Sequence, residues 1–174
     1  SISRSVALAL PPLGLYIRAL LMILGIDPGK DKIGWAFADS KGALLFSGIV
    51  NKEELSSFWE VFMQKQWHNL LPWLKEREKE PFLSESELTI VVGNGTTCKE
   101  VLLFLKERGL DAQVVEEYGT TLEARKVYWR LHPPQGVWKI IPKSLRVPNR
   151  DVDDLAAFVI IRRYLASKTR GQDK

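Results

Sequence analysis

Acidic residues stand at three separated points of this sequence, each next to an apolar run that reads as part of a core. They are Asp27, the pair Glu116 and Glu117, and the group Asp151, Asp153 and Asp154. A carboxylate at the end of a buried strand is costly to desolvate unless a cation or a ligand there needs its negative charge. These three points are therefore the candidates for chemistry.

The pattern of apolar runs predicts the elements that position these residues. Apolar runs indicate five strands, at residues 20–26, 33–38, 43–50, 88–92 and 112–115. Amphipathic segments indicate helices over 51–74, after 97, after 120 and from 151. Strands that alternate with helices after an initial meander predict a mixed α/β sheet with helices on its faces. Because ligands bind outside the carboxyl ends of parallel strands in such sheets, the acidic points are expected to converge.

Local signals refine the helix ends. Thr97 with Glu100, and Thr120 with Glu123, have the spacing of capping boxes. The run KEREKEP at 75–81 reads as a charged, solvated connection that leaves the first helix. These signals place no strand between 51 and 88.

Carboxylates gathered in one place repel one another unless cations neutralise them, so the cluster predicts hard divalent ions such as Mg²⁺ or Mn²⁺. Two ions about 4 Å apart can activate water and stabilise the leaving oxygen of a phosphodiester. The chemistry expected of such a site is metal-dependent hydrolysis of a nucleic-acid backbone.

Each acidic point also has a purely structural interpretation. Asp27, before a Pro-Gly pair, would suit a turn. Of two consecutive strand residues, such as Glu116 and Glu117, only one can point toward the sheet crevice. Asp151 and Asp153 would complement a helix dipole. The pattern alone leaves open which residue of each group serves the site.

Length and composition favour one globular domain with a sizeable core, since the chain has 174 residues, of which 45% are hydrophobic. The net charge of +4 is mild, but basic residues dominate residues 118–150, where Glu123 is the one acid. The seven basic residues are Arg125, Lys126, Arg130, Lys139, Lys143, Arg146 and Arg150. This half of the chain predicts a phosphate-bearing partner.

Cys98 is the single cysteine, which excludes an intrachain disulfide and fits a reducing, cytoplasmic location. Residues 1–21 contain two arginines and no acid, and Pro11-Pro12 interrupts them, so they read as an extension outside the core domain and not as a membrane span. We expect the core domain at 22–168 and a polar tail at 169–174.

Three segments resemble one known family. ILGIDPGKDKIGWAFAD is similar to the opening motif of the RuvC/YqgF branch of RNase H-like nucleases. VVEEYGTTLEAR resembles the acidic, double-threonine segment of YqgF-type proteins, and DVDDLAAFVIIRRYL resembles their terminal helix. The segments match in order and spacing and span nearly all of residues 22–165.

The resemblance implies an RNase H-like fold with a five-stranded mixed sheet in the order 3-2-1-4-5. By motif, Asp27, Glu117 and Asp153 would be catalytic and would hold a two-ion site, with Glu116 and Asp154 as register alternatives. It implies a hydrolase acting on structured nucleic acid, with precursor 16S ribosomal RNA as the preferred substrate and a Holliday junction as the alternative. A non-catalytic nucleic-acid-binding module is a further alternative.

The sequence departs from the family pattern at two places. Glu116-Glu117-Tyr118 replaces an Asp-Glu-Arg run, and VVGNGTT replaces a Gly-Pro-Leu motif, as expected of a divergent subgroup. An actin-like ATPase, whose phosphate loop reads similarly, needs two related domains and is too large for this chain.

Candidate contacts to the nucleic-acid backbone are Lys30, Lys32, Lys139, Lys143, Arg146 and Arg150. Junction resolvases act as two-fold dimers, so a homodimer is a further expectation, with the aromatic helix after residue 51 as its interface.

Overall fold

A computed structural model describes residues 21–78 and 87–172 of the chain. Residues 1–20 of the expected N-terminal extension and residues 173–174 of the expected tail lie outside these ranges. Residues 169–172 of the expected tail continue the last helix. Within the described ranges, no helix is long and apolar enough to cross a bilayer.

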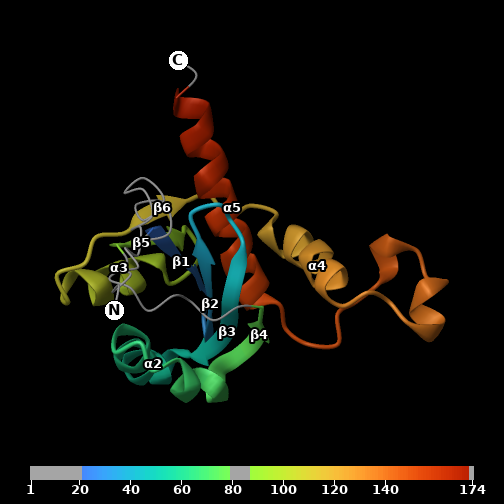
Figure 1. Ribbon diagram of the computed structural model, residues 1–174, viewed down its shortest axis with the longest axis horizontal. Coiled ribbons are helices and arrows are strands. Elements are labelled where there is room, and N and C mark those ends of the chain that lie inside the picture. The colour runs from blue at the N-terminus through green and yellow to red at the C-terminus, as the bar shows by residue number, and fades with distance from the viewer. Residues whose placement is uncertain (1–20, 79–86, 173–174) are drawn as a thin grey trace, which may run out of the picture.

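Six strands form one mixed sheet (Figure 1). They are β1 (Leu21–Pro28), β2 (Lys32–Asp39), β3 (Leu44–Asn51), β4 (Leu74–Arg77), β5 (Glu87–Gly93) and β6 (Gln113–Val115). Their order across the sheet is β4-β3-β2-β1-β5-β6. β1, β5 and β6 run parallel to one another. The neighbouring pairs β1–β2, β2–β3 and β3–β4 are antiparallel. The carboxyl ends of β1, β5 and β6 therefore lie at one edge.

The expectation of five strands is wrong, because β4 adds a sixth at the β3 edge. β4 arises from the charged run that reads as a solvated connection. Its inward-facing residue is Glu76, only 6% exposed, whose charge is neutralised inside the protein by Arg150. A strand with an ionised inward residue lacks the apolar alternation that identifies strands. The other five strands keep the expected order.

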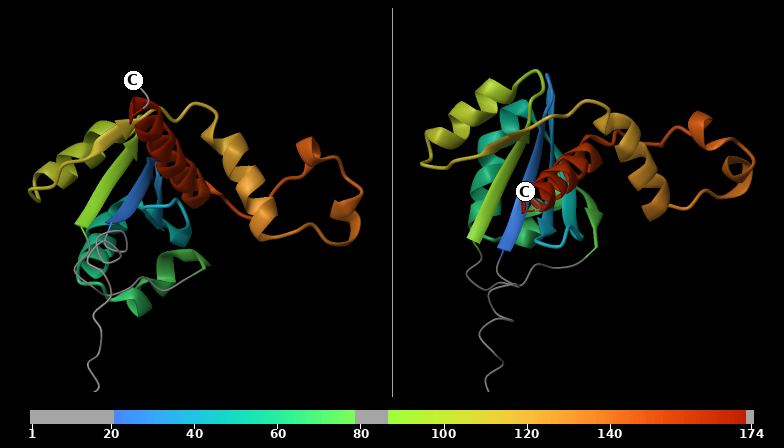
Figure 2. Two further views of the ribbon diagram at one scale, coloured as in Figure 1. Left: turned by 45° about the horizontal axis from the view of Figure 1, so that its top comes forward. Right: turned by 90° about the horizontal axis from the view of Figure 1, so that it is seen from above.

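Helices cover both faces of the sheet (Figures 1 and 2). The α-helices are α2 (Leu55–Met63), α3 (Cys98–Lys106), α4 (Thr120–Leu131) and α5 (Asp153–Gln172). The short 3-10 helices are η1 (Lys52–Glu54), η2 (Trp67–Trp73), η3 (Gly136–Lys139) and η4 (Lys143–Leu145). α2 and α3 pack on one face, and α4 and α5 on the other.

The single helix expected over 51–74 is divided. α2 ends at Met63, and Lys65 then adopts a left-handed backbone conformation with φ 55°. Pro72 lies within η2, just before β4 begins. The break lets the chain turn back and form the edge strand.

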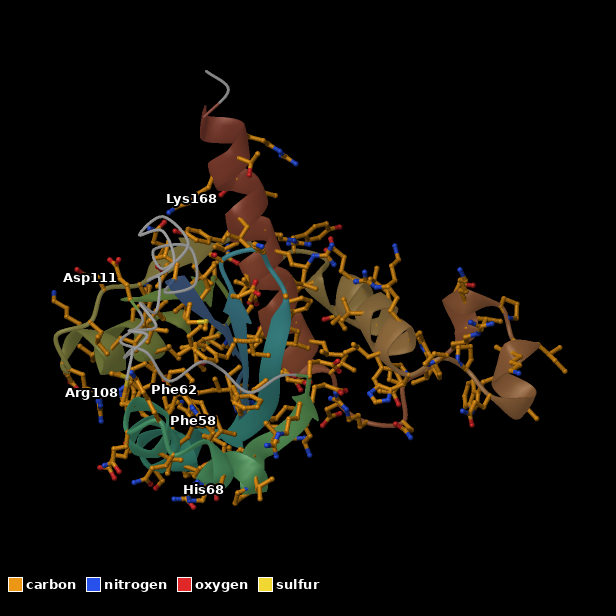
Figure 3. The ribbon with its side chains drawn as sticks, in the orientation of Figure 1. Phe58, Phe62, His68, Arg108, Asp111 and Lys168 are labelled. Carbon is orange, nitrogen blue, oxygen red and sulfur yellow. The ribbon has the colours of Figure 1, made fainter. Side chains whose placement is uncertain are left out.

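The side chains of β2 alternate between the two faces of the sheet, so the hydrophobic core on one face is aromatic and the core on the other face contains small residues. Trp35 and Phe37 face α2, where Phe58 and Phe62 pack against them (Figure 3). Ala36 and Ala38, on the opposite face of β2, are small and are buried against α5. Small side chains let α5 approach the strands closely, which brings its first turn to the edge that carries the acidic residues.

Neither capping box forms. The Thr97 hydroxyl donates to the carbonyl of Gly29 at 2.8 Å, so it ties α3 to the β1–β2 turn. α4 instead begins after Gly119, whose φ of 73° suits glycine, and Thr120 is already helical. Glu123 pairs with Arg163 of α5 at 2.9 Å. Tertiary partners thus replace the local caps at both helices.

Candidate active site

Asp27 lies near the end of β1, opposite Gly34 of β2. Burial raises the pKa of its carboxyl group to about 8, and a hydrogen bond with Glu117 and the negative charges of Glu117 and Asp153 add to this rise. Three chain segments that are far apart in sequence therefore meet at this carboxyl group.

Glu117 follows β6, and glycines make room for its carboxylate. A Cβ on Gly93 would lie 2.3 Å from Oε2, and a Cβ on Gly95 would lie 2.3 Å from Oε1. Asn94 fixes the backbone, because its Oδ1 accepts from the Glu117 amide at 3.1 Å. Oε2 is buried and has no hydrogen-bond partner among the described residues.

Asp153 is the first residue of α5, and its backbone crosses directly over β2. A Cβ on Gly34 would lie 2.0 Å from the Asp153 carbonyl oxygen, so only glycine permits this approach. Burial and the charge of Asp151 raise the pKa of the half-buried Asp153 carboxyl group. Because Gly34 pairs with Asp27, the crossing brings the charge of Asp153 close enough to contribute to the raised pKa of Asp27.

The donor set fits a divalent cation in part. Within residues 21–78 and 87–172, no three His, Cys, Asp or Glu side chains are placed to hold one ion together. The pair Asp27 and Glu117 nonetheless offers a buried oxygen without a partner and two carboxylates whose mutual repulsion a cation would relieve. Mg²⁺ needs only one or two carboxylates, since water and phosphate oxygens complete its shell. The two-ion arrangement stays a prediction.

Glu116 and Asp154, the alternatives to Glu117 and Asp153, bind other partners. Glu116 is exposed and accepts hydrogen bonds from Asn94 Nδ2 at 3.0 Å and from the Tyr118 amide at 3.2 Å. Asp154 is fully buried and accepts from Ser47 Oγ at 2.6 Å and from Arg150 at 2.7 Å. The structure thus brings Glu117 into contact with Asp27 and brings the charge of Asp153 near it, whereas Glu116 and Asp154 have other partners.

Two of the candidate backbone contacts, Arg150 and Lys32, lie near Asp153, but both have carboxylate partners. Arg150 is occupied inside the protein, where it binds Glu76 at 2.6 Å and Asp154 at 2.7 Å. Lys32 pairs with Asp151 at 2.5 Å on the surface. Of the expected set, these two therefore already have carboxylate partners.

The remaining candidates lie on an arm of the chain and in the β1–β2 turn. Lys139 and Lys143 are exposed on an arm, residues 133–149, that projects away from α4 and the sheet (Figures 1 and 2). Arg146 donates to the carbonyls of Ile141 at 2.9 Å and Lys139 at 3.3 Å, so it shapes the arm. Lys30 is exposed in the β1–β2 turn near Asp27.

A cleft of about 810 Å³ opens beside Asp153 and was not expected from the sequence. Its walls come from β3, η2, β4, the first turns of α4 and the base of the arm. Of the expected contacts, Lys32 and Arg150 line it, and so do Lys75 and Arg125, which were not among the expected contacts. Arg125 lies in the basic half of the chain, but only the fold shows which member of that half faces the site.

Replacing Gly34 by Ala tests the crossing of α5 over β2. We expect a loss of about 1–3 kcal/mol in the free energy of unfolding, because the new methyl group must displace the Asp153 backbone. Any activity that needs Asp153 should fall as well. Denaturant unfolding measures the first effect. Gly171→Ala is the matched control, since a Cβ there would meet nothing within 4 Å. Equal stability of the two variants would contradict the crossing.

Comparisons with known proteins do not assign this chain to a family. The sequence matches no protein-family model, and the search of curated proteins found no significant match. Among solved structures, T. thermophilus RuvC in complex with a Holliday junction substrate aligns over 86% of this chain and 96% of that chain, with 13% identity and a TM-score of 0.41. A likeness of this size does not assign a function.

Proposed function

We propose that this protein is a divalent-metal-dependent nuclease with an RNase H-like fold, which hydrolyses phosphodiester bonds in structured nucleic acid. The observation that carries the proposal is the contact between Asp27 and Glu117, with Asp153 beside them, at the carboxyl edge of the parallel strands. Ligands bind at this edge in open α/β sheets.

A purely structural role explains this cluster poorly. A turn-forming aspartate has no reason to be buried against a glutamate, and burial together with this contact raises the pKa of Asp27 to about 8. Two glycines leave space for the Glu117 carboxylate, although one of its oxygens gains no hydrogen bond from the residues that the structure describes. An arrangement that is unfavourable in the free protein is typical of a site that binds a ligand.

Each residue of the candidate active site would have its own role. Asp27 and Glu117 would hold Mg²⁺ or Mn²⁺, and Asp153 would add negative charge on the side of the cleft. The bound ion would supply activation of water and stabilisation of charge on the phosphate. Asn94 and the glycines around Glu117 orient its carboxylate.

We propose processing of precursor 16S ribosomal RNA as the biological reaction, on the strength of the segment resemblance to YqgF-type proteins. The test is cleavage of end-labelled precursor fragments beside a four-way DNA junction, each with Mn²⁺ and with chelator. We expect metal-dependent cutting of the RNA. Symmetric cutting of the junction alone would make the protein a resolvase, and no cutting of either would favour a binding module without catalysis.

A further inference from the structure

The cleft beside Asp153 is polar, and two of its acidic residues already have partners. The Glu54 carboxylate accepts a hydrogen bond from Trp73 Nε1 at 3.2 Å, and Asp151 pairs with Lys32. Asp153 lines the cleft too, and its charge acts on Asp27. Lys75 and Arg125 are further basic side chains that line the cleft.

Lys75 reaches this wall through a β-bulge. Ser47 pairs with Glu76 and Gly48 pairs with Leu74, so Lys75 is the extra residue between two registered pairs. Without the bulge, Lys75 and Glu76 would point to opposite faces of the sheet. Bulges near sites re-aim a side chain in this way. Here the bulge places Lys75 in the cleft while Glu76 stays buried with Arg150.

Arg125 contributes a second positive charge to the cleft. It lies in the second turn of α4, a helix that begins three residues after Glu117. Neither Arg125 nor Lys75 has a carboxylate within ion-pair distance among the described residues, and both are exposed. The charge of Lys75 acts on Asp151 without forming an ion pair with it. The cleft thus carries two cations outside any ion pair among the described residues, and Asp153 of the candidate active site lines the same cleft.

Trp73 provides an aromatic surface in the same cleft. The ring is half-buried, and its edge contact with Phe58 has a centroid distance of 5.9 Å and an interplanar angle of 89°. The hydrogen bond from Nε1 to Glu54 fixes its orientation. The indole is therefore held in place before any ligand binds.

We propose that this cleft binds an unpaired strand of nucleic acid, with Lys75 and Arg125 on its phosphates and Trp73 against a base. Cationic walls combined with an aromatic platform are the means by which proteins bind single strands. A base in a duplex has its faces covered by its neighbours, so only an unpaired base can use Trp73. This binding mode rests on the proposed function only in that the strand would lie next to Asp153. The feature of the substrate that the cleft would recognise is an unpaired segment.

The test is binding measured in chelator, so that cleavage plays no part. Fluorescence anisotropy would follow a labelled oligothymidine strand and a labelled duplex of equal length across a salt series. We expect the native protein to prefer the strand. In the double variant Lys75→Ala with Arg125→Ala, affinity should fall about tenfold, and the slope of log K against log salt should become shallower by about 1.4, since each phosphate contact contributes about 0.7.

Two further variants separate the contributions. Trp73→Leu should weaken strand binding about tenfold with an unchanged salt slope, because stacking involves no counterion release. Lys41→Ala with Arg130→Ala is the matched control, which removes the same charge from a groove lined by Leu44, Phe158 and Leu165. Its binding should equal that of the native protein. Thermal unfolding shows whether each variant is folded.

Two results would overturn the proposal. One is equal affinity and equal salt slope in the cleft variant and the control variant, and the other is duplex binding as tight as strand binding. If Trp73→Leu fails to fold, the exposed pair Lys75 and Arg125 still decides the outcome. Absence of nuclease activity would refute the proposed function without changing these binding results.

Discussion

Asp27→Asn is expected to lower nucleic-acid cleavage by at least about a hundredfold, because a metal-binding carboxylate supplies several kcal/mol of transition-state stabilisation. The substitution keeps the size of the side chain and removes its charge. Asp39→Asn is a matched control, since Asp39 also ends a strand but its Oδ1 accepts from the amides of Lys41 and Ala43 in a hairpin turn. Cleavage rates with Mn²⁺ measure the effect.

The fold of the Asp27→Asn variant should be retained, and in the metal-free protein its stability should depend less on pH. The pKa of Asp27 is about 8 in the folded chain, against 3.8 for the unperturbed group. Between these values the folded protein holds a proton that the unfolded chain has lost. The contribution of Asp27 to the free energy of unfolding of the native protein therefore falls as pH rises from about 4 to about 8, and this contribution changes no further above that range.

The asparagine variant lacks this proton and should lose that part of the slope. Each unit of pKa shift corresponds to about 1.4 kcal/mol, so the difference between the two profiles should be well within reach of denaturant unfolding in chelator. Full cleavage by Asp27→Asn would remove Asp27 from the site. Parallel pH profiles would show that its carboxyl group is not held in the contact with Glu117.

Sequence reasoning anticipates the site because strand ends are easy to locate. The apolar run before Asp27 and the short run before Glu116 mark two strand ends, and parallel strands bring such ends to one edge. The choice between adjacent acids depends on residues elsewhere. Gly34 accepts the backbone of Asp153, whereas Ser47 and Arg150 take the side chain of Asp154. Nothing in the local sequence of α5 shows this division.

The cleft and β4 escape sequence reasoning for a related reason. A basic side chain reads as a surface residue wherever it stands, so periodicity does not distinguish Arg150, which is paired inside, from Arg125, which faces the cleft. The inward Glu76 similarly hides a strand within a charged run. Patterns of apolar residues predict where the backbone goes, but the partners of charged residues are fixed by contacts between distant segments.

Those internal charges predict the second large effect. Arg150→Met is expected to lower the free energy of unfolding by about 3–5 kcal/mol, because it leaves the carboxylates of Asp154 and Glu76, 0% and 6% exposed, without their cation. His132 Nε2, 2.6 Å from Glu76 Oε1, remains as a partner of Glu76 alone. Lys143→Met on the exposed arm should change stability by no more than about 0.5 kcal/mol.

A triple variant separates lost charge pairing from lost packing. Glu76→Gln and Asp154→Asn, combined with Arg150→Met, leave no buried charge without a partner, so much of the lost stability should return. The same measurement reports on the site, because Arg150 ties the first turn of α5 to β4 and Asp153 belongs to that turn. Arg150→Met should therefore impair cleavage even at temperatures where it stays folded. A loss below about 1 kcal/mol in the single variant would mean that Arg150 is free to face a substrate after all.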